Sequence, residues 1–121
     1  MKTFRQALGR WGESLAADYL KQKNYEIVAR NVRTPYGEID LIARQGRVTV
    51  FVEVKTRSSK HFGYPEDAVT PSKQAHMIAA AQFYLMNQPE LDRDWRVDVI
   101  AVQRMRSGQP PQIDHFENAV R

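Results

Sequence analysis

One segment of this 121-residue chain, residues 48–55, alternates valine with other residues over its whole length, in the order VTVFVEVK. Successive side chains of a β-strand point to opposite faces of a sheet, and β-branched residues favour strands. The valines therefore form one apolar face, and we expect this strand to lie centrally in a sheet. Glu53 and Lys55 share the opposite face, where charges within an apolar strand are costly unless they are paired or used.

Periodicity and turn residues predict the other elements. Apolar residues recur at helical spacing over residues 5–23, which predicts an amphipathic helix. Thr70 followed by Pro71 is typical of a helix start, and we expect this second helix to run to about residue 87. Further strands are expected at residues 25–31, 38–44, 95–102 and 112–116, the last at a sheet edge. The order α-β-β-β-α-β-β, without repeat or linker, predicts one α/β domain over residues 1–121, with helices flanking a mixed central sheet.

The composition narrows the class of protein. Hydrophobic residues make up 42% and charged residues 26%, as in a globular domain. Cysteine is absent, which excludes disulfide scaffolds, thiolate metal sites and cysteine nucleophiles and is compatible with a reducing compartment. We find no signal peptide and no apolar run of roughly 18 residues, so we expect the cytoplasm and no membrane partner. A glycine-rich phosphate loop and a serine-nucleophile motif are also missing from the sequence.

Two carboxylates, Glu38 and Asp40, come before the central strand in the sequence, and a third, Glu53, lies within it. Glu38 and Asp40 fall on one face of their predicted strand, and neighbouring strands lie about 5 Å apart, so Asp40 can approach Glu53. Carboxylate oxygens are the ligands that Mg²⁺ prefers. Asp40 and Glu53, with the main-chain carbonyl of Val54, therefore predict a Mg²⁺ or Mn²⁺ site for phosphodiester hydrolysis. In this interpretation Lys55 orients the attacking water or stabilises charge that develops on the phosphate.

The same residues admit a structural interpretation. Glu53 and Lys55 can form an ion pair on a solvated sheet face, with Asp40 as an exposed carboxylate beside them. Motifs this short recur by chance, so the spacing alone leaves both interpretations open.

Two segments resemble the motif of the PD-(D/E)xK nuclease superfamily. They read GEIDLI at residues 37–42 and FVEVKTR at residues 51–57. More narrowly, the chain resembles the YraN family of uncharacterised bacterial proteins, and more distantly the archaeal Holliday junction resolvases. This likeness spans nearly the whole chain and includes Gly12-Glu13, Arg30-Asn31-Val32-Arg33, Lys73 and Arg96-Val97-Asp98-Val99.

The resemblance implies a restriction-endonuclease-like fold and a set of roles. Asp40 and Glu53 would be metal ligands, Lys55 would act in catalysis, and Glu13 would be an additional metal ligand from the first helix. Ile39 stands where the superfamily's eponymous proline would be, but relatives often lack that proline. On a helical wheel Glu13 falls beyond the apolar stripe, so it points either over the sheet edge or into water. Whether Glu13 or Glu38 completes the metal shell stays open in the sequence.

Positive charge gathers in the first half of the chain. Eighteen Lys and Arg against fourteen Asp and Glu give a net charge of +4, and the first 60 residues alone carry +6. Arg30, Arg33, Arg57 and Lys60 surround the candidate site in sequence and are expected to contact the phosphates of nucleic acid. Lys73, near the start of the second helix, either reaches a substrate phosphate or extends into solvent.

Other residues receive structural interpretations. Arg96 and Asp98 share a strand face and are expected to pair. Without cysteine or close spacing, three histidines are expected at the surface, namely His61, His76 and His115. Three aromatic residues fit core or interface packing, namely Trp11, Trp95 and Tyr84. The predicted apolar stripe of the first helix consists of Leu8, Trp11, Leu15, Ala16, Tyr19 and Leu20.

The sequence therefore predicts a Mg²⁺- or Mn²⁺-dependent endonuclease acting on structured or branched DNA. By analogy with resolvases, which cut two strands, a two-fold homodimer is consistent with this function. The alternative is a non-catalytic nucleic-acid-binding or adaptor module with the same fold. Lys55 separates the two, because only the nuclease needs it for activity.

Overall fold

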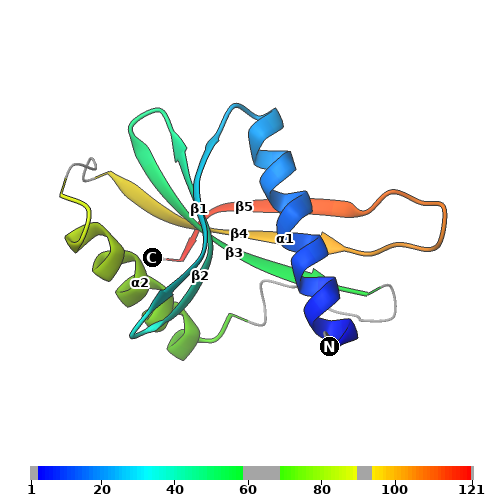
Figure 1. Ribbon diagram of the computed structural model, residues 1–121, viewed down its shortest axis with the longest axis horizontal. Coiled ribbons are helices and arrows are strands. Elements are labelled where there is room, and N and C mark those ends of the chain that lie inside the picture. Colours follow the sequence, from blue (N-terminus) through cyan, green and yellow to red (C-terminus); the bar gives the residue numbers. More distant parts are fainter. Residues whose placement is uncertain (1–2, 59–68, 90–93, 121) are drawn as a thin grey trace.

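The computed structural model describes residues 3–58, 69–89 and 94–120. They form a five-stranded sheet in the order β1-β2-β3-β4-β5, with helix α1 crossing one face and α2 covering the other (Figure 1). The elements are α1 Phe4–Gln22, β1 Glu26–Thr34, β2 Gly37–Gln45, β3 Val48–Arg57, α2 Pro71–Met86, β4 Trp95–Gln103 and β5 Gln112–Val120. The predicted α/β class and the order of elements are therefore confirmed.

The sheet is mixed because its two halves are connected differently. β1, β2 and β3 form an antiparallel meander, whereas β3 and β4 are parallel and are connected through α2. β5 returns antiparallel to β4 at the edge. β3 has a neighbour on each side, which confirms the central position predicted from its valines. β1 and β5 both extend beyond their predicted ends, because their ladders continue to Thr34↔Gly37 and Val97↔Val120.

Alternation along the strands divides the core into two layers. Val50 and Val52 of β3 pack with Leu20 of α1, whereas Phe51 packs with Ala80 and other residues of α2. Both helices bury alanines against the sheet, which permits close approach of the backbones. The edge-on contacts that Phe51 makes with Tyr84 and Trp95 confirm core packing for those two aromatics.

The face with which α1 packs overlaps the predicted stripe but is shifted toward the small residues. Ala16 and Leu20 are buried, and Leu15 and Tyr19 pack against the core, as predicted. Trp11, expected in the core or an interface, is 36% exposed within this chain. An added Cβ on Gly12 would overlap the Thr56 hydroxyl, so the helix backbone contacts β3 directly at this glycine. The helix is thereby rotated toward its small residues, and the buried set is Gly12, Ala16, Ala17 and Leu20.

The structure does not describe residues 59–68, between β3 and α2. Lys60, expected to contact phosphate, and His61, expected at the surface, therefore lie outside the described residues. Within the described ranges, neither helix is long and apolar enough to cross a membrane.

Candidate functional site

The candidate site lies where strands β2 and β3 separate. Within residues 3–58, their ladder runs from Gln45↔Val48 to Leu41↔Val52 and then ends. The next residues along each strand are Asp40 and Glu53. Here the amide of Val54 donates a hydrogen bond of 2.8 Å to Oδ2 of Asp40, where a regular ladder would use a main-chain carbonyl. The Asp40 side chain is therefore held between the two strands.

Asp40 lies in an electrostatically unfavourable position. Burial and the nearby charge of Glu53 raise the pKa of Asp40 to about 8, and Glu13 adds to the effect, although the hydrogen bond from Val54 opposes it. Two adjacent carboxylates disfavour simultaneous ionisation because their charges repel one another. A divalent cation would remove this penalty by compensating both charges.

Lys55 pairs with Glu53 on the α2 side of the sheet. Nζ of Lys55 lies 3.2 Å from Oε1 of Glu53, and the side chains are 10% and 20% exposed, respectively. Asp40 is also only partly accessible. The structural interpretation requires a solvated sheet face and an exposed Asp40. Both requirements are wrong, because the side chains of Asp40, Glu53 and Lys55 are largely withdrawn from water.

A second lysine reaches the site from α2. The hydroxyl of Thr70 caps this helix by accepting a hydrogen bond from the amide of Lys73, which fixes the first turn beside the site. The close approach of Lys55, together with burial, lowers the pKa of Lys73, and the charge of Arg57 contributes further. Two neighbouring ammonium groups repel each other unless an anion lies between them. Lys73 therefore lies beside the site, but it is exposed, so the two expectations for it, a phosphate contact or an extension into solvent, both stay open.

Glu13 points over the sheet. The contact of Gly12 with Thr56 brings α1 close to β3, and Glu13 is partly buried. Burial and the charges of Glu38 and Glu53 raise the pKa of Glu13. The alternative in which Glu13 extends into water is therefore wrong.

Asn31 connects the carboxylates of Glu13 and Glu38. It was not identified as a site residue from the sequence. In the amide orientation that satisfies its hydrogen bonds, its nitrogen donates to Oε1 of Glu13 and Oε1 of Glu38, each at 3.0 Å. Asn31 adopts φ 52° within β1, a conformation that asparagine tolerates better than most residues. The only signal for it was its position in the similar segment Arg30-Asn31-Val32-Arg33.

The donor set is compatible with a hard divalent cation. In the described part of the chain, no group of three histidine, aspartate or glutamate side chains is arranged to hold a metal ion. Asp40 and Glu53 provide two carboxylates, and Mg²⁺ in phosphate chemistry is usually held by one or two carboxylates with water and substrate oxygens. Two carboxylates therefore suffice for this kind of site, and Glu13 and Glu38 lie farther out, joined by Asn31.

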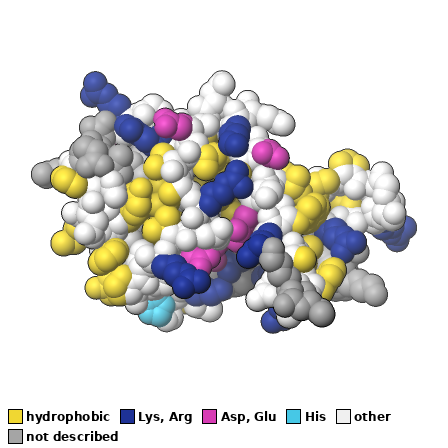
Figure 2. All heavy atoms as spheres, viewed as in Figure 1, with side chains coloured by type: hydrophobic (Ala, Val, Ile, Leu, Met, Phe, Trp, Pro, Cys, Tyr) yellow, Lys and Arg dark blue, Asp and Glu magenta, His cyan; other side chains and the backbone are white. Residues whose placement is uncertain are grey.

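A basic groove lies between α1 and β1 next to the acidic group. It has a volume of about 810 Å³, and its lining includes Arg10, Arg30 and Arg33 together with Glu13 and Glu38. Figure 2 shows basic and acidic side chains beside one another across the middle of this face. Arg10 was not predicted, although it is three residues before Glu13 and so falls on the same side of the helix.

Asp98 has the structural role that the sequence predicted. It is fully buried and accepts hydrogen bonds from Arg96 at 3.0 Å, from Nε2 of His115 at 2.7 Å and from the amide of Asn118 at 2.8 Å. Burial alone would raise the pKa of Asp98, but these bonds lower it below its usual value. The prediction of a surface His115 is wrong, since its side chain is only 5% exposed. The physical reason is that the buried carboxylate of Asp98 needs more hydrogen-bond partners than Arg96 supplies. His76 is exposed, as predicted.

Together, fold and site define a mixed α/β domain with an acidic pair and two lysines at the opening between antiparallel strands. The model of the Uncharacterised protein family UPF0102 matches residues 12–102, a range that contains all of these side chains. A UPF0102 protein of Syntrophotalea carbinolica is 48% identical over 116 residues, covering 95% of this chain and 92% of the relative. One of Geobacter metallireducens is 49% identical over 119 residues, covering 98% and 96%, respectively. The chain belongs to the UPF0102 family, which confirms the resemblance to the YraN family.

Proposed function

We propose that this protein is a metal-dependent endonuclease that hydrolyses phosphodiester bonds in structured or branched DNA. The observation that carries the proposal is the grouping of Asp40, Glu53, Lys55 and Lys73 where β2 and β3 separate. An acidic pair beside two lysines suits a cation and a phosphate at the same time. A restriction-endonuclease-like arrangement of the sheet and a cytoplasmic location are parts of this proposal.

Each side chain of the site has a distinct role in the proposed reaction. Asp40 and Glu53, with the main-chain carbonyl of Val54, would hold Mg²⁺ or Mn²⁺. Such a cation, when bound, polarises the phosphate and lowers the pKa of a coordinated water. Lys55, positioned by Glu53, orients the attacking water or stabilises negative charge on the phosphate, and Lys73 binds a phosphate oxygen.

The basic groove would hold the DNA backbone on the α1 side of the site. Arg10, Arg30 and Arg33 line this groove and would neutralise phosphates of the backbone, which contributes affinity without reading base sequence. Arg57 lies on the other side, close enough for its charge to act on Lys73. A two-fold dimer would present two such sites to two strands of a branched substrate.

A non-catalytic nucleic-acid-binding or adaptor module is the second candidate. It is favoured by the finding that, among the described residues, no three acidic or histidine side chains come together as a metal site. The basic groove would serve such a module equally well. The two candidates differ in what they require of Asp40 and Lys55.

Cleavage assays with a matched variant test the proposal. Wild type and Asp40→Asn are incubated with linear, single-stranded, flap and four-way-junction DNA in Mg²⁺, Mn²⁺ or EDTA. Asn keeps an oxygen that can accept the hydrogen bond from Val54 but removes the negative charge. The nuclease predicts cleavage that requires metal and is lost in the variant. Binding of DNA by both proteins, with cleavage by neither, would instead support the adaptor.

A further inference from the structure

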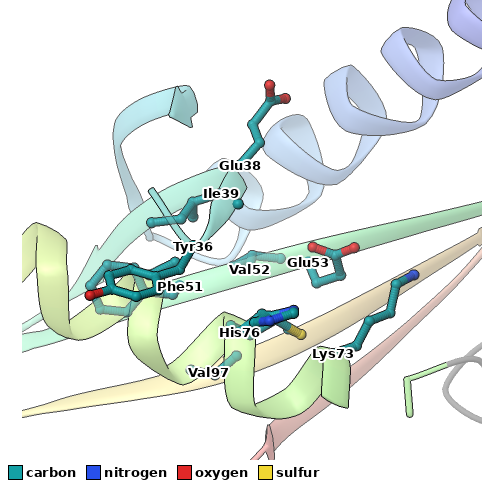
Figure 3. A pocket seen from close by; sticks show the side chains of 12 residues that line it. Tyr36, Glu38, Ile39, Phe51, Val52, Glu53, Lys73, His76 and Val97 are labelled. Atoms are coloured by element: carbon teal, nitrogen blue, oxygen red, sulfur yellow. The ribbon is translucent and has the colours of Figure 1, made fainter. Parts of the chain in front are cut away.

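A cavity of about 210 Å³ adjoins the candidate site on the α2 side of the sheet. Figure 3 shows Glu53 and Lys73 at one end of it and Tyr36 and Phe51 at the other. The side chain of Glu38 points away from the cavity, toward α1. A group bound in this cavity would therefore lie beside the phosphate that Lys73 is proposed to hold.

The walls of the cavity combine an apolar base with an aromatic rim. Ile39, Phe51 and Val97 are buried core residues that form part of its lining. Tyr36, 50% exposed, and His76 from α2 contribute planar side chains at its accessible part. This combination favours a flat, largely apolar ring with polar edges.

Tyr36 is held in place before any ligand binds. Its amide donates a hydrogen bond of 3.1 Å to the Thr34 hydroxyl, which in turn donates to the carbonyl of Gly37 at 2.7 Å. Gly37 adopts φ 131°, which only glycine reaches without strain, so the turn is well defined. Phe83 of α2 packs edge-on against the Tyr36 ring at 6.3 Å. A preformed aromatic wall reduces the entropy lost when a ring stacks on it.

We propose that this cavity receives the unstacked base of the nucleotide next to the phosphate that is cut, an inference that rests on the proposed function. Its volume of about 210 Å³ is below the roughly 300 Å³ of pockets that enclose a whole drug-sized ligand, so it suits one ring system. Aromatic side chains stack on any base, and bases become available where a strand is unpaired. The substrate class is therefore DNA with an unpaired nucleotide at the cleavage position, such as a flap or a branch point.

Equilibrium binding in EDTA to a flap duplex tests this inference, because the junction fixes the register and metal-dependent cleavage is prevented. In successive substrates one flap nucleotide is replaced by an abasic residue. The abasic residue should weaken binding roughly tenfold at one position and little elsewhere. Tyr36→Ala and His76→Ala should each weaken binding of the intact flap, and for these variants the abasic residue at that position should cause little further loss. Phe4→Ala, which removes an exposed aromatic outside the cavity, should behave as wild type.

Two outcomes would overturn the inference. In the first, the abasic residue weakens DNA binding equally at every position. In the second, the loss of affinity in the Tyr36 and His76 variants and the loss caused by the abasic residue are fully additive. Circular dichroism of both variants checks that these exposed substitutions leave the fold intact. Cleavage of the same flaps by wild type and Asp40→Asn in Mg²⁺ tests the nuclease separately. Position-dependent binding without cleavage would support the base-binding cavity and contradict the nuclease proposal. Cleavage without position-dependent binding would support the nuclease and contradict the base-binding cavity.

Discussion

Asp40 and Val54 are joined by a 2.8 Å hydrogen bond from the Val54 amide to the Asp40 carboxylate, at the place where the β2–β3 ladder stops. The bond fixes the carboxylate through a main-chain donor. It leaves Glu53 free to pair with Lys55 at 3.2 Å. The opening between the strands is thus occupied by charged side chains whose positions are set by the ends of the ladder.

Asp40 should make the stability of the metal-free protein depend on pH. Its pKa of about 8 lies above the roughly 3.9 of an unfolded chain, so its contribution to stability is fully present below about pH 4 and is lost as pH rises through about 8. Relative to Asp40→Asn, wild type should lose about 1–2 kcal/mol of unfolding free energy between about pH 5 and pH 8.5, after allowance for solvent screening and for coupling to Glu53. Urea denaturation in EDTA measures this difference. Parallel pH profiles for the two proteins would show that Asp40 is already ionised at the lower pH.

Lys55 should be needed for the chemical step more than for binding. Lys55→Met keeps the buried aliphatic stem and removes the charge that Glu53 positions, so single-turnover cleavage should fall about 10²- to 10³-fold. DNA affinity in EDTA should change by less than about tenfold, since one phosphate contact among several is lost. Lys21→Ala, an exposed lysine at the end of α1, serves as the control. Unchanged cleavage in Lys55→Met would remove Lys55 from the catalytic machinery.

The central strand and the order of elements could be predicted because alternation and capping are local properties. The valines of β3 specify a period of two, which also fixes Glu53 and Lys55 on one face. Thr70 specifies the start of α2 through its own hydroxyl, and this in turn places Lys73. In these cases the sequence neighbours of a residue determine its environment.

The rest of the site depends on contacts between distant segments. The rotation of α1 is set by the contact of Gly12 with Thr56, and this decides that Glu13 points to the sheet and leaves Trp11 partly exposed. Asn31, which bridges α1 and β2, has a positive φ inside a strand, and alternation does not predict such a residue. A helical wheel gives the relative directions of side chains but not the side that faces the sheet.

The two glycines of α1 should respond oppositely to alanine. At Gly12 an added Cβ would overlap Thr56, so Gly12→Ala should destabilise the fold by about 1–3 kcal/mol. At Gly9 an added Cβ would meet no atom within 4 Å, so Gly9→Ala should stabilise the helix by about 0.5–1 kcal/mol. Chemical denaturation of both variants measures the two changes. A neutral Gly12→Ala would show that α1 does not lie this close to β3 in solution.

The contribution of the basic groove to DNA binding should be measurable from the salt dependence of the affinity. If Arg10, Arg30 and Arg33 each neutralise a phosphate, replacing any one by Gln should lower the slope of log affinity against log salt concentration by about 1 in magnitude. The loss should be similar for unrelated DNA sequences, because contacts to the backbone carry no base information. Arg106→Gln, in the connection between β4 and β5 and away from this groove, should leave the slope unchanged. Equal slopes for wild type and the three groove variants, measured by fluorescence anisotropy over a salt series, would mean that the DNA backbone runs elsewhere on the protein.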